Sequence, residues 1–457
     1  MKKITFIAIL ILLNSQLVSS QCWQKVSAGD GHTLAIKDDG TLWAWGGNIL
    51  GGVGDGTNIN RDYPVMIGTD NDWVEISAGN LSSFAIKEDG SLWAWGYNAH
   101  GILGNGNQAN QFYPIRIGFD NDWSKVSFYG PGTMALKTNG TLWAWGIDAN
   151  FFASNIPVQI NGTENWKSII AGINHRGALT VDGALWMWGE NDWGQIGNGT
   201  TEDQATLTKI DSTSVWKQIA LGFDNSWGIK EDGTLWTWGI NSVGAPADPT
   251  LWTLTTPTQI TTDNDWAYVI AGDANVIALK DDGTLWAWGT NQFGQLGIGD
   301  TSQYITIPTE IGNDDDWILP IGTRLHNFAF KNDGTLWAWG WNSIGQLGNA
   351  NSQNQYSPVK INCIISEINP QPISGFEIHL FPNPSTELVK IRCTTPITSN
   401  ILWIMYDQLG REMRKTVLPA GKQVIQVGVE AIPSGLYVWR AFVDGQMLDY
   451  GKLIISK

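Results

Sequence analysis

One eight-residue stretch recurs along most of the chain and restricts the folds that the chain can adopt. The stretch Asp39-Gly40-Thr41-Leu42-Trp43-Ala44-Trp45-Gly46 has seven copies, whose first glycines stand at positions 40, 90, 140, 183, 233, 283 and 334. Every copy keeps the ending Trp-x-Trp-Gly. A period of about 50 residues is typical of solenoids and propellers.

The chemistry within each copy favours the propeller. Asp-Gly between two apolar segments favours a two-residue type I′ hairpin loop, because both residues tolerate the positive φ that this turn requires. A loop at residues 39–40 would place two bulky pairs on one face of the hairpin and a small pair on the other: Ile36 with Trp43, Leu34 with Trp45, and Ala35 with Ala44. Such faces would let neighbouring copies nest. We therefore predict an all-β chain whose repeats form a seven-bladed β-propeller.

The amino terminus has the features of a secretory signal peptide. Met1-Lys2-Lys3 is basic, residues 4–13 are apolar, and Val18-Ser19-Ser20 offers small residues for cleavage. We assign residues 1–20 to this peptide and residues 21–363 to the propeller, so the mature protein is expected outside the cytoplasm. The apolar run is too short to span a bilayer, and no transmembrane segment is predicted.

The negative charge is concentrated in the repeats. Of the formal charge of −16, the first 20 residues contribute +2 and residues 364–457 contribute +1, so residues 21–363 have a charge of −19. A body this acidic repels phosphate backbones, and nucleic acid is not an expected partner.

Each repeat is expected to contain four strands, which for the second copy are residues 73–78, 84–87, 91–96 and 114–117. In an antiparallel meander, alternate connections lie at the same edge of the ring. The Asp-Gly hairpins should therefore share one edge, the acidic rim, with the links at 70–72, 120–122, 263–265 and 314–316. The long Gly/Asn loops, such as 98–106 and 291–297, should form the opposite edge, the long-loop rim.

The extended pattern at residues 282–297 and 333–348, Asp-Gly-Thr-Leu-Trp-Ala-Trp-Gly-x-Asn-x-x-Gly-Gln-Leu-Gly, resembles the regulator of chromosome condensation repeat. The resemblance covers residues 22–361 and implies a seven-bladed propeller. Eponymous members of that family exchange nucleotide on a small GTPase and bind chromatin, and other secreted members bind and inhibit β-lactamases. This chain has no room for a large wedge insertion and no basic tail, so we expect the fold without the exchange function.

The pattern changes after the last repeat. Residues 364–376 are predicted to be a linker, and residues 377–457 contain short alternating strands typical of a small Ig-like β-sandwich. Segments 377–385, 403–412, 434–439 and 452–457 together resemble the C-terminal sorting domain of the type IX secretion system. That resemblance implies secretion machinery as a partner, passage across the outer membrane, removal of the domain, and release or attachment at the cell surface. An accessory β-domain is the alternative.

No motif predicts catalysis, so we expect a protein that is not an enzyme. His32, His175 and His326 occupy one repeat position in different blades, and we predict hydrogen-bonding roles at strand entry instead of a metal triad. The acidic links are expected to form Asx turns, with weak Ca²⁺ binding as the alternative. No other cofactor or metal is predicted.

Most of the 27 tryptophans are expected to build the blades. Six further aromatic residues are expected on the long-loop rim, where they would contact a partner or pack within the loops: Tyr97, Phe151, Phe152, Trp193, Trp252 and Trp341. We predict a secreted or surface-displayed, non-catalytic propeller that binds an extracellular protein through this rim. A lectin-like, carbohydrate-binding propeller is the alternative, followed by a polysaccharide lyase or hydrolase.

The two ends of the repeat array predict a disulfide. Laid on the second repeat, Cys363 takes the position of Thr69 and Cys22 that of Asp72. These positions are three residues apart across a turn, where Cα atoms lie within about 7 Å, and disulfides need Cα separations of roughly 4.4–6.8 Å. We predict that a Cys22–Cys363 bond closes the ring.

Overall fold

The computed structural model describes residues 22–148, 152–160, 162, 164–241, 252–362, 378–393, 399–406, 412–443 and 446–457. The chain divides into two compact units, Met1–Cys363 and Ile364–Lys457, each with its own core. Within the described residues, no helix is long and apolar enough to cross a membrane.

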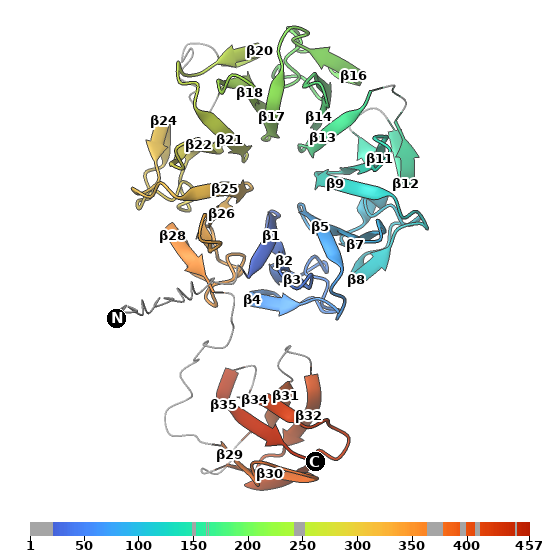
Figure 1. Cartoon of the computed structure of the whole chain (residues 1–457), viewed down its shortest axis with the longest axis vertical. Helices are drawn as coiled ribbons and strands as arrows, with labels where there is room; N and C mark the ends of the chain where they lie inside the picture. The colour runs from blue at the N-terminus through green and yellow to red at the C-terminus, as the bar shows by residue number, and fades with distance from the viewer. Residues whose placement is uncertain are drawn as a thin grey trace, which may run out of the picture. The chain divides into compact units, whose positions relative to one another are not determined.

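The first unit is a ring of seven four-stranded antiparallel sheets, which confirms the predicted seven-bladed β-propeller (Figure 1). Each sheet pairs its strands in chain order, so every blade is one uninterrupted segment of the chain. The first strand of each blade faces the centre of the ring and the fourth lies outermost (Figure 1).

Blades 1–4 have the following strands: β1 (Trp23–Ala28), β2 (His32–Lys37), β3 (Leu42–Gly46) and β4 (Arg61–Met66); β5 (Trp73–Ala78), β6 (Ser82–Lys87), β7 (Leu92–Gly96) and β8 (Gln111–Arg116); β9 (Trp123–Tyr129), β10 (Gly132–Lys137), β11 (Leu142–Asp148) and β12 (Phe152–Gln159); β13 (Trp166–Ala171), β14 (His175–Thr180), β15 (Leu185–Gly189) and β16 (Gln204–Ile210).

Blades 5–7 follow the same plan: β17 (Trp216–Leu221), β18 (Asn225–Lys230), β19 (Leu235–Ile240) and β20 (Thr253–Gln259); β21 (Trp266–Ala271), β22 (Asn275–Lys280), β23 (Leu285–Thr290) and β24 (Tyr304–Glu310); β25 (Trp317–Gly322), β26 (His326–Lys331), β27 (Leu336–Gly340) and β28 (Gln355–Ile361). A short 3₁₀ helix, η1 (Ala99–Gly101), lies in the long loop of blade 2.

The hairpin at each Asp-Gly differs from the predicted two-residue loop. The N–H of Lys37 donates to the carbonyl of Thr41 at 3.0 Å, and the N–H of Gly40 donates to Lys37 at 2.9 Å, so the loop has three residues. Only its last position, Gly40, has a positive φ, +77°. This is the geometry of a type I turn followed by a glycine bulge, which the Asp-Gly signature fits as well as it fits a type I′ turn.

The longer loop shifts the register by one residue and moves side chains to the opposite face. The pairs are Ala35 with Trp43 and Ile36 with Leu42, so the predicted division into a bulky and a small face is wrong. Instead, one face presents tryptophans beside alanine, and the other presents aliphatic side chains.

These two faces pack against each other between blades. The aliphatic face of blade 1, with Leu34 and Ile36, contacts Trp73 and Trp95 of blade 2 in one buried cluster. A buried aromatic side chain removes about 150–250 Å² from water, which at about 25 cal/mol per Å² is roughly 4–6 kcal/mol before entropy is counted, an upper bound. The recurrent tryptophans therefore hold neighbouring blades together.

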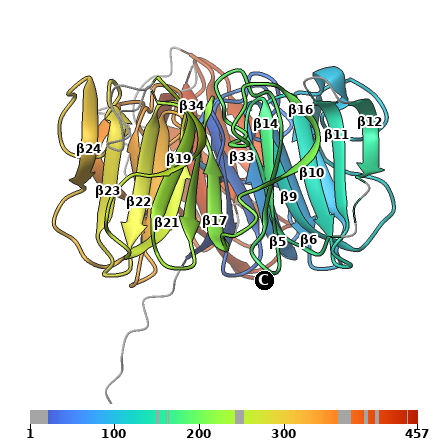
Figure 2. The ribbon, with the colours of Figure 1, turned by 90° about the horizontal axis from the view of Figure 1, so that it is seen from above.

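The two rims lie where the strand order places them. The N–H of Trp73 donates to the carbonyl of Gly40 at 3.2 Å, and the N–H of Glu88 donates to Asp72 at 2.7 Å, so hairpins and acidic links meet at one rim. The backbone N–H of Trp341 donates to the carbonyl of Leu325, which lies in the turn at the other end of blade 7. The strands run between these two rims (Figure 2).

The ring closes between blades 7 and 1 by packing. Trp23 and Trp45 share a buried cluster with Phe328 and Ile361, and Cys22 packs against the same cluster. Cys363 lies outside the described residues, so the Cys22–Cys363 disulfide stays a prediction.

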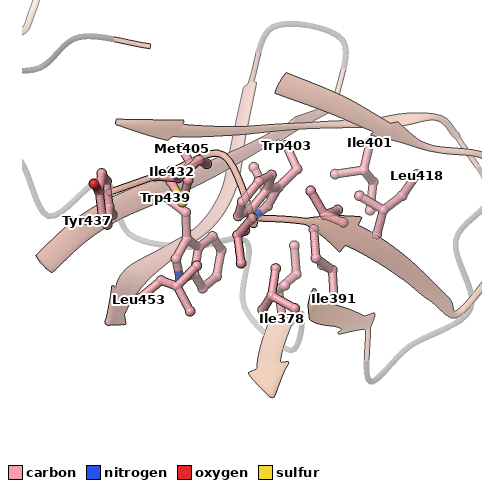
Figure 3. Close-up of a cluster of buried hydrophobic side chains, with 14 of the residues drawn as sticks. Ile378, Ile391, Ile401, Trp403, Met405, Leu418, Ile432, Tyr437, Trp439 and Leu453 are labelled. Carbon is pink, nitrogen blue, oxygen red and sulfur yellow. The ribbon is translucent and has the colours of Figure 1, made fainter. Parts of the chain in front are cut away.

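The second unit contains two antiparallel sheets. One has the order β29 (Ile378–Phe381), β30 (Leu388–Cys393), β33 (Val424–Gly428), and the other β32 (Glu412–Leu418), β31 (Ile401–Tyr406), β34 (Gly435–Val443), β35 (Gln446–Ile455). Trp403 and Trp439 of one sheet share a core with Ile391 of the other (Figure 3). Two packed sheets are consistent with the predicted small sandwich, whose Ig-like topology stays a prediction. The predicted linker, residues 364–376, lies outside the described residues.

Candidate functional site: the long-loop rim

A buried asparagine braces most of the long loops. In blade 4, the side-chain oxygen of Asn191 accepts the N–H of Ile196 at 2.9 Å, and its amide donates to the carbonyl of Thr200 at 3.0 Å. Equivalent asparagines occupy blades 1, 2, 6 and 7: Asn48, Asn98, Asn291 and Asn342. One buried amide that satisfies several backbone groups fixes a loop without a hydrophobic core of its own.

Each braced loop also rests on the next blade. The Nε1 of Trp95 donates to the carbonyl of Gly52 in the preceding blade at 2.9 Å. In blade 4, the backbone of Gly194 lies so close to β20 that an added Cβ would be 2.8 Å from the Cα of Thr255, and its φ is +73°. These braced loops are therefore a preformed part of the long-loop rim.

The predicted rim aromatics fall into three groups. Trp193 and Trp252 are exposed, at 42% and 74% of their surface. Tyr97 is half-buried against the core between blades 2 and 3, and the ring of Trp341 lies 6.3 Å from that of Phe293. Phe152 begins β12, and Phe151 lies outside the described residues.

The two exposed indoles lie on adjoining segments of blades 4 and 5. Trp193 precedes Gly194, which packs on Thr255, and Trp252 immediately precedes β20. The N–H of Trp193 donates to the buried side chain of Gln195 at 2.9 Å, which fixes the backbone of this loop. The structure thus brings these two predicted residues into one region of the rim.

Acidic side chains gather beside this region, and sequence reasoning missed them. Burial, followed by the negative charges of Glu190, Asp273 and Asp192, raises the pKa of Asp224 to about 6. Burial and the charges of Asp203 and Asp192 raise the pKa of Glu190. Asp192 acts on the pKa of both Asp224 and Glu190, and Glu190 acts on that of Asp224, so these carboxylates share one electrostatic environment.

Further charged groups occupy the turns between the first and second strands of the blades, at the same rim. Asp30 of blade 1 accepts a hydrogen bond from the hydroxyl of Tyr129 of blade 3, and burial raises the pKa of Asp30. Arg324 of blade 7 forms an ion pair with Asp273 of blade 6, whose pKa burial raises to about 6. The sequence feature that could have identified this group is the turn between the first two strands of a blade. Asp30, Asp273 and Arg324 share one repeat position in that turn.

The predicted roles of the repeat histidines are confirmed. The Nε2 of His32 is 2.7 Å from the hydroxyl of Ser83, and that of His175 is 2.9 Å from Ser226, each in the next blade. Burial lowers the pKa of His32 to about 4 and that of His175 to about 3, so both rings are neutral at pH 7. These histidines link neighbouring blades.

The acidic links bind lysines of the chain itself. Lys87 places its ammonium 2.6 Å from Asp70 and 3.0 Å from Asp72, over the rings of Trp73 and Trp93. Among the described residues, no group of three or more His, Cys, Asp or Glu side chains is arranged to hold a metal ion. Weak Ca²⁺ binding by the links stays an untested alternative.

The chain belongs to the family of proteins with an RCC1-like domain. The model of this domain matches residues 9–317, the regulator of chromosome condensation (RCC1) repeat matches residues 333–375, and the secretion system C-terminal sorting domain matches residues 379–456. Both resemblances noted from the sequence are therefore confirmed, and the sorting domain supports export to the cell surface or the medium.

Solved structures of similar fold include human WBSCR16, with 18% identity over 70% of this chain and 94% of that one, at a TM-score of 0.65. Prp20p from Saccharomyces cerevisiae, whose binding to Gsp1p and histones has been described, has 24% identity over 66% and 80%, at 0.59. These likenesses show the fold alone. The ultraviolet-B receptor UVR8 of Arabidopsis thaliana is 39% identical over 72 residues, which are 15% of this chain and 16% of that protein.

Proposed function

We propose that this protein is a non-catalytic binding propeller, exported by a signal peptide and the type IX route, that engages an extracellular protein through its long-loop rim. The sorting domain supports the exported state. The predicted signal peptide, residues 1–20, lies outside the described residues and is part of this proposal.

The observation that supports binding best is the blade 4–5 patch, defined as Trp193, Trp252, Glu190, Asp192 and Asp224. Trp193 and Trp252 are exposed on adjoining segments, and the hydrogen bond from the backbone N–H of Trp193 to Gln195 holds the loop of Trp193 in place. Tryptophan is enriched in interface hot spots, and a preformed loop loses little entropy on binding. The neighbouring carboxylates favour a partner with a basic surface.

A glycan is the second candidate ligand. Trp252 is 74% exposed, and a flat exposed indole suits the apolar face of a sugar ring. A polysaccharide lyase or hydrolase is the third candidate, and turnover of a polysaccharide by the purified protein would replace the non-catalytic proposal.

The test compares the purified protein with Trp193→Ala and Trp252→Ala in quantitative capture from the native surroundings and on a glycan array. The affinity of both variants for the partner should fall at least tenfold, since truncation of a hot-spot residue costs about 2 kcal/mol or more. The matched control is Phe119→Ala, which removes a side chain 93% exposed in a link of the opposite rim. Equal loss in the control would contradict the rim assignment, and loss on the glycan array alone would favour the lectin.

A further inference from the structure

Six blades fill the same place on the acidic rim with a lysine of their own. The second strand ends in a lysine whose ammonium lies over tryptophan rings: Lys37, Lys87, Lys137, Lys230, Lys280 and Lys331. Lys137 is typical, with its ammonium 4.8 Å and 4.6 Å from the ring centres of Trp123 and Trp143 and 2.6 Å from Asp120. We call this arrangement the lysine clamp. It provides cation–π attraction in all six blades and, in every one of them except blade 1, charge-assisted hydrogen bonds to carboxylates of the preceding link.

Blade 4 keeps the aromatic part of the clamp without its lysine. Thr180 pairs with Trp166 as Lys137 pairs with Trp123 in blade 3. The rings of Trp166 and Trp186 still meet edge to face, 6.2 Å apart at 78°. A pocket of about 450 Å³ lies at this place, and Thr180, Trp186, Glu164 and Asp182 line it.

A second substitution leaves a hydrogen-bond donor at the pocket. In the other six blades the first indole of Trp-x-Trp donates to a hairpin hydroxyl, as Trp143 does to Thr141 at 3.0 Å. Blade 4 has Ala184 at that position, and among the described residues the buried Nε1 of Trp186 has no hydrogen-bond partner. A buried donor without an acceptor is costly, so a ligand that supplies an acceptor is favoured.

The charge at the pocket favours a cation. Glu164 and Asp182 supply two carboxylates, and a hydrogen bond from Thr180 lowers the pKa of Asp182. Lys209, which pairs with Trp186 across the strands, is exposed and supplies one positive charge at the edge. The pocket therefore retains a formal charge of about −1 beside an aromatic wall, the combination that recognises ammonium groups.

We propose that the blade 4 pocket binds a primary alkylammonium group, taking the place that the chain's own lysine fills in the other six blades. The group can belong to a lysine side chain of a polypeptide or to a free amine. A polypeptide also offers a main-chain carbonyl to the Nε1 of Trp186. The site is on the acidic rim and is independent of the blade 4–5 patch.

The test is a titration of the purified protein, with both units present, followed through the indole N–H resonance of Trp186 and by calorimetry. The probes are Nα-acetyl-lysine N-methylamide, n-butylamine and the uncharged norleucine analogue of the first. We expect saturable binding of the lysine probe near about 1 mM, as for one cation–π contact with partial charge compensation. Tighter binding of the lysine probe than of butylamine assigns the pocket to polypeptides, and equal binding assigns it to the ammonium group alone.

Two variants make the test specific. Thr180→Lys restores the clamp from within the chain, and it should weaken amine binding at least about tenfold while the protein stays as stable as the wild type. Glu164→Gln removes one carboxylate and should weaken binding about threefold or more. Amine binding that persists unchanged in Thr180→Lys, equal binding of the norleucine analogue, or no saturable shift in the wild type would overturn the proposal.

Discussion

At the scale of single residues, the propeller positions groups whose ionisation depends on burial. His32 is buried and neutral, and its ring contacts Ser83 of the next blade. Asp224 faces other carboxylates on the long-loop rim. Burial thus lowers the pKa of His32 and raises that of Asp224, although the two residues occupy adjacent repeat positions, because the first is cationic when protonated and the second is anionic when deprotonated.

We predict that His32→Asn makes the protein less sensitive to acid. The folded pKa of His32 is about 4 and its ordinary value is 6.5, so the unfolded state binds more protons between these values, and the stability is lost as pH falls through this window. Relative to wild type, the variant should gain about 3 kcal/mol in free energy of unfolding from pH 7 to pH 4. Urea unfolding at both pH values measures this, with the exposed His100→Asn as control. The prediction is refuted if the free energy of unfolding changes between the two pH values by the same amount in His32→Asn as in the wild type.

A second prediction concerns Asp224. Its pKa is raised to about 6, so the carboxylate gains a proton as pH falls through 6, and affinity for a cationic partner should decrease there. Glu190→Gln removes a repelling charge and should move the midpoint to lower pH. Carbon NMR of the aspartate carboxyl groups measures the midpoint, and a midpoint near pH 4 in the wild type would contradict the prediction.

At the scale of elements, the lysine clamp ties the second strand of a blade to the link that precedes its first strand. Lys87, at the end of β6, contacts Asp70 and Asp72, which precede β5. We expect Lys87→Met to lower the free energy of unfolding by about 2 kcal/mol, since it removes the cation–π contact and leaves two carboxylates facing each other. Thermal unfolding with Lys217→Met, an exposed lysine of β17, as control measures the effect. If the control lost as much free energy of unfolding, the lysine clamp would make no specific contribution to stability.

The elements also show how far the sequence could be interpreted. The positions of the two rims follow from strand order alone, so their prediction is right even though the predicted hairpin register is wrong. The register itself depends on whether the loop begins at Asp38 or Asp39, and Asp-Gly is compatible with both. The lysine clamp was missed because Lys87 is far from Asp70 in sequence, and only the folded blade brings them together. The blade 4–5 patch was half predicted, since Trp193 and Trp252 were named without the carboxylates beside them.

At the scale of the whole molecule, the ring closes where blade 7 meets blade 1. As at every other blade junction, no strand is shared there, and the contact includes the cluster around Trp45 and Phe328 and a hydrogen bond from the indole of Trp45 to the carbonyl of Gln346 at 2.8 Å. We predict that Cys22→Ser lowers the free energy of unfolding by up to about 4 kcal/mol, because the predicted bond to Cys363 closes a loop of more than 300 residues. Non-reducing peptide mapping identifies the bond, and Cys393→Ser in the second unit is the control. Free thiols at both Cys22 and Cys363 would rule the bond out.

Because every blade completes its own sheet from adjacent strands, nearly all strand pairing is local along the chain. Topologies of this kind fold faster than those in which distant segments must meet first. Each blade can therefore form its hairpins without the other blades, and the two ends of the ring meet only in the last step, when blade 7 packs against blade 1.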